Sequence, residues 1–381
     1  MKLVHVFSAP QSAFFFMKGQ LNYMQDNGVK VTVIMPMDKV FNPKFIEQNP
    51  GVNVVNITIK REISILNDID SLCKLIKQFY KLDPDIIHLH TPKASLLGVI
   101  AGRVLFKKPI IYQMHGLISI EGNKVKKNIV HYMEKMTCRL ATKILAVSSS
   151  IMNFAIEHNY CPSKKIKVIG HGSINGINYE NRFNPALIKF EDGKLNSLKS
   201  KNFIIGFVGR LLRDKGIEDY LKVISKFKEN KIPVMGFVVG PNESGNDFKD
   251  YLSNYNLKLN DDIIVFGQKL EPEKIMVYFD VLLLPTKREG FGLVAAEANA
   301  LEIPVIGYNI PGFKDAVVNG KTGKLVSYKD TEKLYKATLK YYQNPSLKDS
   351  HGKKGRERVI QDFNSSNLWR SLLNEYERLL S

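Results

Sequence analysis

The hydrophobic positions of this chain form short apolar runs that alternate with longer stretches of helical periodicity. The runs are rich in β-branched residues and have the length of buried strands. A helix is expected at Gln11–Asn27, where Gly28 would end it. In the first half, strands are predicted at Lys2–Phe7, Val29–Met35, Val52–Ile59, Asp85–His90, Ile110–Met114 and Ile144–Val147.

The same alternation restarts after a polar segment, Phe183–Lys201, which we interpret as the hinge and linker. A helix is expected at Gly216–Phe227, and a last helix at Asn367–Leu380. The strands predicted in the second half are Phe203–Val208, Pro233–Val239, Ile263–Phe266, Val281–Leu284 and Pro304–Ile306. Since such alternation implies parallel sheets covered on both faces, we predict an α/β fold of two doubly wound, Rossmann-like domains facing a central cleft, 1–185 and 186–364.

The composition is that of an ordinary globular protein, with 44% hydrophobic and 24% charged residues among 381. It excludes a mostly disordered chain, a collagen-like repeat and a small disulfide scaffold. The net charge is +18, and residues 91–176 alone hold 13 basic and 3 acidic side chains. An anionic partner is therefore expected. A lysine-rich proteome would explain part of the excess but not its clustering.

The three cysteines show no C-x-x-C spacing, which favours a reducing cytosol. Ser8 and Pro10 interrupt the apolar start of the chain, so a signal peptide is not expected. No run of about 18 apolar residues occurs that could span a membrane. The sequence therefore predicts a cytoplasmic protein.

Two cations follow the predicted strand Phe203–Val208, namely Arg210 and Lys215. Lys215 lies where the next helix begins and where backbone N–H groups favour an anion. A guanidinium fork and an ammonium point charge together suit a diphosphate. On spacing alone, two cations that merely decorate a strand–helix loop are an equal alternative.

Glycines and carboxylates follow the predicted strand Val281–Leu284. Gly290 and Gly292 would let a ligand approach the backbone closely and would free N–H donors where a helix begins. Glu289 precedes that helix, and Glu297 lies more than one turn inside it. A carboxylate beside an anion site can accept hydrogen bonds from hydroxyls, which a sugar supplies, so a nucleotide sugar is indicated. An ordinary capped helix with a solvated glutamate is the alternative.

These segments resemble the retaining glycosyltransferases of family four, which have the two-Rossmann B fold. The resemblance covers residues 204–325. It rests on G-R-x-x-x-x-K-G at Gly209–Gly216, V-V-G-P at Val238–Pro241, V-F-G at Val265–Gly267, E-G-F-G-L-V-x-x-E at Glu289–Glu297, and I-P-V-I-G at Ile303–Gly307 followed by Pro311–Asp315. It implies that 1–185, with the terminal helix 365–381 packed on it, binds the acceptor and that 186–364 binds the nucleotide sugar.

The resemblance also implies a role for each motif residue. Arg210 and Lys215 would hold the donor diphosphate, Glu289 would accept hydrogen bonds from the donor sugar, and Glu297 would bind the ribose. The donor site would further include Gly240, Phe266 and Gly267 near the base, Gly290, and the N–H groups of Phe291, Gly292, Leu293 and Val294.

The first half resembles the family in fewer places. Asp85–His90 (DIIHLH) is similar to a family strand, and of its two histidines one is expected in the core and one near the cleft. His115 stands where the family's histidine faces the transferred sugar, so it joins Arg210, Lys215 and Glu289 as a catalytic candidate. Two departures are that Ser8–Ala13 (SAPQSA) lacks the usual glycine pair and that Asn178 replaces the usual aspartate.

Two D-x-D sequences look like metal motifs, Asp68–Asp70 and Asp83–Asp85. Both precede predicted elements, so we interpret the first as a helix start and the second as a helix-to-strand turn. No metal or other cofactor is expected, because Arg210, Lys215 and helix amides would neutralise the leaving diphosphate.

A helical wheel of 124–143 separates a basic stripe from an apolar one. The basic stripe consists of Lys127, His131, Lys135, Arg139 and Lys143. The apolar stripe consists of Val125, Ile129, Tyr132, Met136 and Leu140. The apolar stripe is expected to pack inward and the basic stripe to face anionic lipid. Nucleic acid is not expected as a partner, because no recognition motif accompanies the charge.

The combined prediction is a retaining, metal-independent hexosyltransferase on the inner face of the cytoplasmic membrane. It would move a sugar from a nucleoside-diphosphate sugar, with a UDP-sugar expected, to a lipid-linked saccharide in capsule, lipopolysaccharide O-antigen or related glycan assembly. Two alternatives stay open: a nucleotide-sugar epimerase or hydrolase on the same fold, and a non-catalytic anion-binding protein.

Overall fold

The computed structural model describes residues 1–381 except 61, 63, 106–107, 117–123, 190–191 and 244–247. The chain divides into two units. Unit 1 consists of Met1–Gly176 and Ser365–Ser381, and unit 2 consists of Ile177–Asn364. Residues 177–185, which the sequence assigned to the first domain, therefore belong to unit 2.

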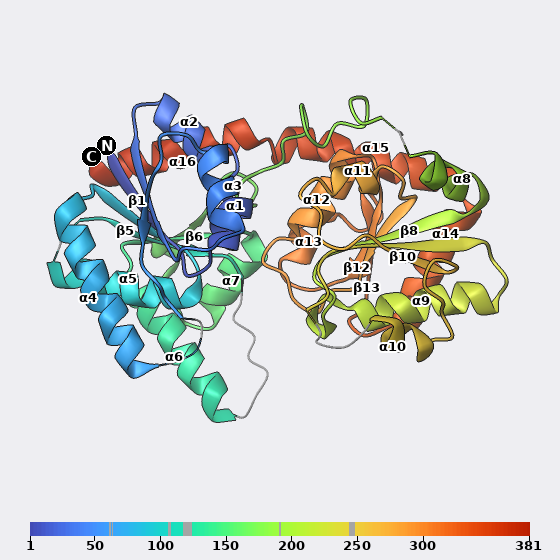
Figure 1. Ribbon diagram of the computed structural model, residues 1–381, viewed down its shortest axis with the longest axis horizontal. Helices are drawn as coiled ribbons and strands as arrows, with labels where there is room; N and C mark the ends of the chain where they lie inside the picture. The colour runs from blue at the N-terminus through green and yellow to red at the C-terminus, as the bar shows by residue number, and fades with distance from the viewer. Residues whose placement is uncertain (61, 63, 106–107, 117–123, 190–191, 244–247) are drawn as a thin grey trace. The chain divides into compact units, whose positions relative to one another are not determined.

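Unit 1 contains a parallel sheet whose described strands have the order β3-β2-β1-β4-β5-β6-β7 (Figure 1). The strands are β1 (Lys2–Val6), β2 (Lys30–Met35), β3 (Asn53–Asn56), β4 (Ile86–Leu89), β5 (Ile110–Met114), β6 (Lys143–Ala146) and β7 (Ile166–Val168). The helices are α1 (Pro10–Phe16), α2 (Gln20–Asp26), α3 (Phe41–Gln48), α4 (Ile65–Leu82), α5 (Pro92–Leu105), α6 (Lys124–Leu140), α7 (Ser149–Glu157), the 3-10 turn η1 (Ser163–Lys165) and α16 (Ser365–Leu380).

Unit 2 repeats this plan with a parallel sheet in the order β10-β9-β8-β11-β12-β13. Its strands are β8 (Phe203–Val208), β9 (Val234–Val239), β10 (Ile263–Val265), β11 (Val281–Leu284), β12 (Val305–Tyr308) and β13 (Gly323–Val326). Its helices are α8 (Gly193–Lys201), the 3-10 turn η2 (Arg213–Lys215), α9 (Ile217–Glu229), α10 (Phe248–Ser253), α11 (Glu273–Met276), α12 (Leu293–Ala300), α13 (Phe313–Ala316), α14 (Thr331–Gln343) and α15 (Pro345–Asp362).

The predicted strands are present, and the predicted pair of Rossmann-like sheets is confirmed. The sequence reading missed the short edge strands β7 and β13. It also read Phe183–Lys201 as a linker, whereas α8 occupies the end of that segment. Asp192 caps α8, because its side chain accepts hydrogen bonds from the N–H groups of Lys194 and Leu195.

Helices cover both faces of the unit 1 sheet. Val4 and Val6 of β1 pack in one core with Phe79 of α4. Leu3 and Phe7 pack in a second core with Tyr376 of the C-terminal helix α16. This division follows from the two-residue period of a strand, which sends alternate side chains to opposite faces. The terminal helix thus completes the covering of the sheet in unit 1.

One predicted helix is divided in two. The sequence pattern predicts a continuous helix over Gln11–Asn27, but α1 ends at Phe16 and α2 begins at Gln20. Gly19 between them has φ +78°, and a Cβ on it would lie 2.7 Å from the indole ring of Trp369. The break therefore makes room for the tryptophan of α16, a contact that the local pattern of residues 11–27 cannot reveal.

Helix α6 buries a different face from the one expected. Ile129 and Tyr132 of the apolar stripe are 46% and 69% exposed, so the prediction that this stripe packs inward is wrong for these two residues, whereas Leu140 is partly buried and packs against the core. Glu134 and Cys138 are buried instead. The carboxylate of Glu134 accepts a hydrogen bond of 2.5 Å from the hydroxyl of Tyr112 on β5, which satisfies it beneath the helix.

The basic stripe is also shorter than expected. Helix α6 ends at Leu140, so Lys143 is the first residue of β6 rather than part of the helix. Lys135 and Arg139 are exposed on α6. The side chain of Lys127 lies outside the described residues. No described helix combines the length and apolar character needed to cross a membrane.

Both D-x-D sequences have the local structure that the sequence predicted. Asp68 lies in the first turn of α4, and its carboxylate pairs with Lys93 at 2.6 Å. Asp83 forms the C-cap of the same helix with φ +42°. Its carboxylate lies 2.8 Å from the ammonium of Lys108, which lowers the pKa of Asp83 through a hydrogen bond and charge attraction.

Candidate active site

The charged candidate residues of the donor site follow β8 and β11, the two strands on either side of the point where the strand order reverses. β8 pairs with β9 on one side and with β11 on the other. In open parallel sheets, loops diverge at such a switch point and leave room for a ligand beyond the carboxyl ends of the strands. Arg210 and Lys215 follow β8, and Glu289 follows β11.

Backbone hydrogen bonds join the two loops. The carbonyl of Asp214 accepts hydrogen bonds from the N–H of Lys287 at 2.8 Å and from the hydroxyl of Thr286 at 3.3 Å. Gly216 has φ +79°, and a Cβ on it would lie 1.9 Å from the carbonyl oxygen of Pro285. Only glycine permits this approach, and the approach fixes the start of α9 against the end of β11.

This approach places Lys215 and Glu289 in direct contact. The ammonium of Lys215 donates a 2.6 Å hydrogen bond to the carboxylate of Glu289, and the two side chains are 22% and 16% exposed. An ammonium has three N–H donors, so the same lysine can bond a phosphate oxygen and this carboxylate together. The carboxylate in turn can accept hydrogen bonds from sugar hydroxyls, as its position before α12 suggested.

The loops of this edge hold two further ion pairs. The guanidinium of Arg210 contacts the carboxylate of Glu243 at 3.1 Å, and Arg210 is 37% exposed. The guanidinium of Arg288 contacts Asp214 at 3.4 Å. Sequence reasoning assigned no role to Glu243 or Asp214. The sequence does contain a signal for these two residues. They are acidic, and they lie in the loops after β8 and β9, at the same edge of the sheet as Arg210 and Lys215.

Glycines shape the backbone at the start of α12, as the motif at Glu289–Glu297 predicted. Gly292 forms the N-cap with φ +85°. A Cβ on Gly312 would lie 2.3 Å from the carbonyl oxygen of Glu289, so a second close approach holds this turn. Phe291 is buried against the ring of Phe363, with 5.0 Å between centroids. Its side chain is therefore part of the core, and a ligand could use only its backbone, like that of Gly290 and of the half-buried Leu293 and Val294 in the first turn.

The predicted base-binding residues lie in the adjoining loops. The N–H of Gly240 donates to the carbonyl of Gly267 at 2.9 Å. A Cβ on Gly240 would lie 1.8 Å from the carbonyl oxygen of Gly209. The ring of Phe266 packs on Phe237, with 5.2 Å between centroids. The loops after β8, β9 and β10 are thus in contact, which places Gly240, Phe266 and Gly267 on the same edge as Arg210.

Glu297 lies half-buried in α12, and a residue that sequence reasoning missed lies within its electrostatic reach. The guanidinium of Arg182 donates to both carboxylate oxygens of Glu273, at 2.8 and 3.0 Å. Burial lowers the pKa of Arg182, but the bonds to Glu273 and the charge of Glu297 outweigh burial and raise the pKa overall. No motif marked Arg182, because it acts across a gap of about a hundred residues.

The remaining candidate, His115, belongs to unit 1 and follows β5. It is half-buried and lies beside buried imidazoles from the central strands, with His88 1% and His90 0% exposed. Both are buried, so the expectation that one of them lies in the core is confirmed, and the position of the other near the cleft stays a prediction. Burial lowers the pKa of His115 to about 4 and that of His5 to about 3, so both rings are neutral at pH 7.

Three of these rings could approach one metal ion. Ring nitrogens of His5, His88 and His90 lie within 4.8 Å of one another, and they form the single group of this kind among the described residues. However, both nitrogens of His88 are engaged, with the hydroxyl of Tyr376 at 2.7 Å and the side chain of Gln113 at 3.2 Å. A metal would have to displace such bonds, so the donor set fits a hydrogen-bonded core better than a metal centre.

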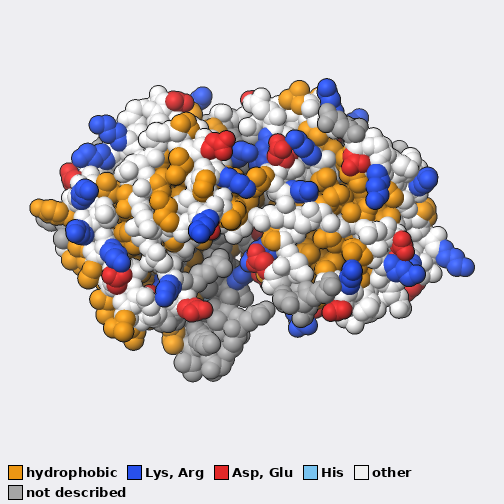
Figure 2. Space-filling model, in the orientation of Figure 1, with side chains coloured by type: hydrophobic (Ala, Val, Ile, Leu, Met, Phe, Trp, Pro, Cys, Tyr) orange, Lys and Arg blue, Asp and Glu red, His pale blue; other side chains and the backbone are white. Residues whose placement is uncertain are grey.

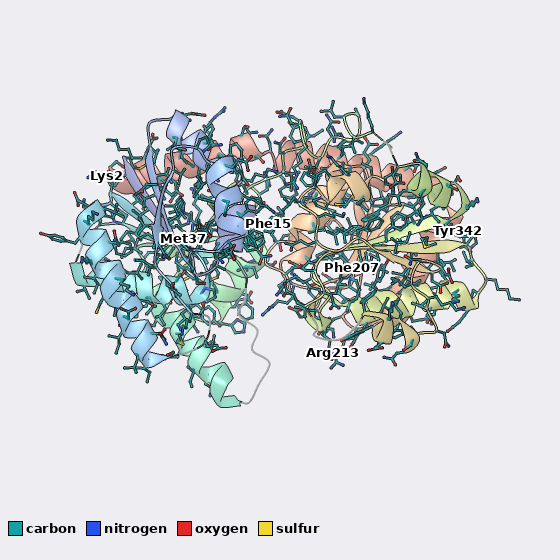
Figure 3. The ribbon with its side chains drawn as sticks, viewed as in Figure 1. Lys2, Phe15, Met37, Phe207, Arg213 and Tyr342 are labelled. Carbon is teal, nitrogen blue, oxygen red and sulfur yellow. The ribbon has the colours of Figure 1, made fainter. Side chains whose placement is uncertain are left out.

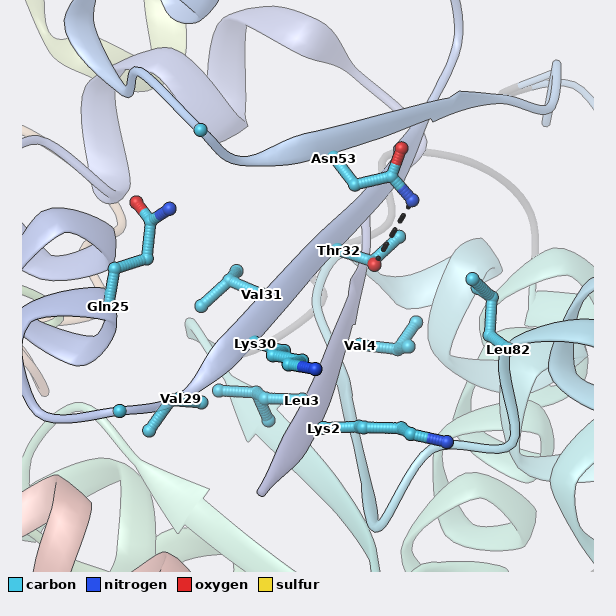
Figure 4. Close-up of a pocket in the computed structure, with 12 residues that line it drawn as sticks. Lys2, Leu3, Val4, Gln25, Val29, Lys30, Val31, Thr32, Asn53 and Leu82 are labelled. Atoms are coloured by element: carbon cyan, nitrogen blue, oxygen red, sulfur yellow. Dashed lines mark hydrogen bonds between the residues drawn. The ribbon is translucent and has the colours of Figure 1, made fainter.

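A pocket in unit 1 lies away from all these residues, at the amino ends of β1 and β2. It has a volume of about 590 Å³ and is lined by residues that include Lys2, Lys30, Thr32 and Asn53 (Figure 4). The amide of Asn53 donates to the hydroxyl of Thr32 at 3.3 Å. Because catalytic side chains of open parallel sheets lie at the carboxyl ends, this pocket is not part of the candidate site.

Sequence comparison matches each unit to a known family. Residues 189–358 match the family "Glycosyl transferases group 1", and residues 17–173 match "Glycosyltransferase Family 4". The chain is 33% identical over 383 residues to "Capsular polysaccharide biosynthesis glycosyltransferase CapM" of Staphylococcus aureus, covering 100% of this chain and 97% of the relative. It is 30% identical to "UDP-Gal:alpha-D-GlcNAc-diphosphoundecaprenol alpha-1,3-galactosyltransferase" of Escherichia coli, covering 81% and 79%.

Solved structures share the fold at low sequence identity. Sucrose-phosphate synthase from Thermosynechococcus elongatus has a TM-score of 0.82 at 20% identity and covers 100% of this chain and 99% of that one. Anabaena Alr3699/HepE in complex with UDP-glucose has a TM-score of 0.80 at 18% identity and covers 99% and 100%. At these identities the likeness shows the fold.

Proposed function

Because the chain belongs to the glycosyltransferases of group 1 and family 4 and acts in the biosynthesis of capsular polysaccharide or a related glycan, we propose that it moves a hexose from a UDP-sugar to a lipid-linked saccharide with retention of configuration. One observation carries the donor half of this proposal. Arg210, Lys215 and Glu289 lie at the switch point of unit 2, where cations suit a diphosphate and a carboxylate suits sugar hydroxyls.

Uridine and a lipid-linked acceptor are supported by what the relatives are named for. The Escherichia coli relative uses UDP-Gal and a diphosphoundecaprenol-linked sugar. Alr3699/HepE was solved with UDP-glucose. In this chain, the loops with Gly240, Phe266 and Gly267 would receive the base, and the ribose would bond Glu297.

In the reaction, the bond between the anomeric carbon and the β-phosphate oxygen breaks as the acceptor hydroxyl adds to the same face of the sugar. The proton of that hydroxyl passes to the departing phosphate. Arg210, Lys215 and the N–H groups at the start of α12 stabilise the negative charge that develops on the diphosphate, which is the main catalytic contribution. No carboxylate is assigned as a covalent nucleophile, and no metal takes part.

Product analysis tests this function. The purified protein is incubated with a panel of UDP-hexoses, with and without an undecaprenyl-diphosphate-linked saccharide. The expected result is a saccharide that is one hexose longer, with the anomeric configuration of the donor retained. Release of free hexose at the same rate without acceptor, or conversion of one UDP-sugar into another, would identify a hydrolase or an epimerase and contradict the proposal.

The acceptor half requires unit 1 to meet a lipid surface, and exposed apolar side chains on α4 and α6, two helices that both pack against α5, support this. Ile65, Leu66 and Ile69 in the first turns of α4 are 74%, 83% and 54% exposed. Figure 2 shows hydrophobic side chains at the surface over this end of α4. With the exposed apolar residues of α6, they would enter the headgroup region of an anionic membrane, while Lys135 and Arg139 would attract its charge.

Vesicle sedimentation tests the membrane contact. Replacing Ile65, Leu66 and Ile69 by Ser should reduce pelleting with anionic vesicles, and Lys135→Glu with Arg139→Glu should do so most at low salt, since charge attraction is screened within about 8 Å at physiological salt. The control is Tyr328→Ser, which removes an exposed aromatic ring of unit 2. If the control releases the protein as well as the α4 variant does, the assignment to this surface is wrong.

A further inference from the structure

Three imidazoles of unit 1 form a hydrogen-bonded series that ends at His115. The Nε2 atom of His115 lies 3.2 Å from Nδ1 of His90. The Nε2 atom of His90 lies 2.9 Å from Nδ1 of His5. The rings come from three adjacent parallel strands, His5 on β1, His90 directly after β4 and His115 directly after β5. In the register of the sheet His5 is the partner of His88, so His90 lies two residues further toward the carboxyl end, and His115 is displaced in the same direction again.

The protons of the three rings depend on one another. Burial lowers the pKa of all three, so each ring is neutral and carries a single N–H. Each link needs one N–H and one lone pair. If His5 bears its proton on Nδ1, it donates to His90, which must then bear its proton on Nδ1 and donate to His115. The opposite choice at His5 reverses both links, so the series has two intact arrangements.

The surroundings of Nε2 of His5, the buried end of the series, decide between the two arrangements. Among the described residues, Nε2 of His5 has no hydrogen-bond partner, and His5 is 0% exposed. A buried N–H without an acceptor is rarer in proteins than an acceptor without a donor. Nε2 of His5 therefore keeps its lone pair, and both links run outward with Nδ1 of each ring as the donor.

We propose that His5 and His90 are positioning residues that fix the proton of His115 on Nδ1, so that this ring offers an N–H donor and not an acceptor to a hydroxyl of the donor sugar. The part that concerns the sugar rests on the proposed function. A neutral imidazole can serve as such a donor, as it does in other enzymes whose histidine is kept uncharged. Because Nε2 accepts from His90, Nδ1 is the nitrogen through which His115 can meet a ligand.

Aromatic neighbours hold the rings in this geometry. The ring of Phe7 stacks on His90 at 4.2 Å with an interplanar angle of 7°. The ring of Phe16 stacks on His115 at 4.9 Å and 22°. Such stacking restricts rotation about χ2, which would put ring carbons where the two nitrogens lie and break the series.

Two-bond proton–nitrogen NMR correlation of the full chain with 15N-labelled histidine tests the proton positions directly. His115 is identified from the signal that His115→Gln removes. The expected result is a proton on Nδ1 of His115 and of His90. A proton on Nε2 of His115 would overturn the proposal, whether or not the proposed transfer of a hexose from a UDP-sugar is found.

Variants test what enforces the tautomer. His90→Leu removes the donor and should allow a proton on Nε2 of His115. His90→Asn should keep it on Nδ1, because the amide N–H₂ can donate from nearly the same position. His5→Leu should also keep it there, since Nε2 of His90 would become the buried end. If the proton of His115 moves to Nε2 in His5→Leu, the argument that the buried end of the series keeps a lone pair is wrong.

Kinetics separate the sugar contact from the tautomer. His90→Leu should lower kcat about 3- to 10-fold, the scale of one hydrogen bond, and His90→Asn should recover most of this loss. Affinity for UDP should not change, because its site lies in unit 2. The matched control is His88→Leu, which removes an equally buried imidazole outside the series and should change neither tautomer nor kcat. A normal kcat in His90→Leu with a displaced proton would refute the role toward the sugar.

Discussion

In both units, polar side chains cluster at the carboxyl ends of the parallel strands. In unit 1 these side chains are buried, neutral imidazole rings, whereas in unit 2 they are partly exposed ion pairs. His5 and His90 are 0% exposed, and burial holds the pKa of each below the ordinary value for histidine. Arg210 and Lys215 remain partly exposed, and each lies against a glutamate. The same sheet topology therefore carries two kinds of chemistry.

The difference follows from the cost of removing charge from water. A buried ion needs a partner and further hydrogen bonds, and a buried imidazole avoids that cost by giving up its proton. In unit 1, each ring finds its hydrogen bonds in a neighbouring strand. In unit 2, the cations keep their charge because they stay partly exposed and each is paired with a carboxylate.

The largest effect is expected from removing a cation of unit 2. Lys215→Ala or Arg210→Ala should lower turnover about 10²–10³-fold, the scale of one lost stabiliser of transition-state charge. Folding should survive, because both side chains lie partly in solvent. The measurement is kcat with a UDP-sugar and acceptor, together with the melting temperature.

Arg213→Ala is the matched control for this comparison. Arg213 lies in the same turn η2, is 74% exposed and pairs with Glu218 (Figure 3). Its loss should leave turnover within about twofold, since an exposed ion pair contributes roughly 0–1 kcal/mol. Equal losses in the Arg213 and Lys215 variants would mean that general charge, and not the diphosphate contact, sets the rate.

A smaller but substantial effect should come from the close approach that positions Lys215. Gly216→Ala would place a Cβ against the carbonyl of Pro285 and should cost about 2 kcal/mol or more in stability. Gly320→Ala is the control, because Gly320 has a similar φ of +74° with nothing within 4 Å of the added Cβ. Urea unfolding followed by circular dichroism compares them. A larger loss in Gly320→Ala would show that backbone strain and not the contact matters.

Acid should destabilise unit 1 through its neutral rings. The pKa of His5 falls from 6.5 to about 3 on folding, so the unfolded chain binds the extra proton between these values. The contribution of neutral His5 to the free energy of unfolding is fully present above pH 6.5 and is lost as the pH falls toward 3. At pH 5 the loss is about 2 kcal/mol for His5.

The single tryptophan makes this measurable. Trp369 of α16 donates its indole N–H to the side chain of Asn175 at 2.7 Å, so its fluorescence reports on unit 1. The urea concentration at the midpoint of unfolding, followed by fluorescence, should decrease as the pH is lowered from 6.5 to 5. The substitution His5→Leu should reduce this decrease. An unchanged slope in His5→Leu would assign the acid sensitivity to other groups.

The smallest effect is expected from metal removal. The single group of three possible metal ligands among the described residues lies in unit 1, while the diphosphate would meet Arg210 and Lys215. Turnover in excess EDTA should match turnover without it. Loss of activity that Mg²⁺ or Mn²⁺ restores would show that the cations of unit 2 do not suffice.

Much of the fold could be read from local pattern. The strand Phe203–Val208 and the strand Val281–Leu284 have the bounds that the apolar runs predict, because a buried parallel strand needs an unbroken apolar run on both faces. The local sequence pattern gave wrong predictions where contacts with distant residues determine the structure. The break at Gly19 depends on Trp369, and the exposed face of α6 depends on the hydrogen bond that buries Glu134.

The sequence by itself determined the alternation of strands and helices in each half and the motif residues after β8 and β11, since apolar periodicity and glycine spacing are local properties. Only the tertiary structure decided which polar groups meet. It paired Lys215 with Glu289, placed Arg182 within reach of Glu297, and aligned His5, His90 and His115. These contacts join residues that are distant in the chain, and the protonation of the histidines depends on burial, which no local pattern records.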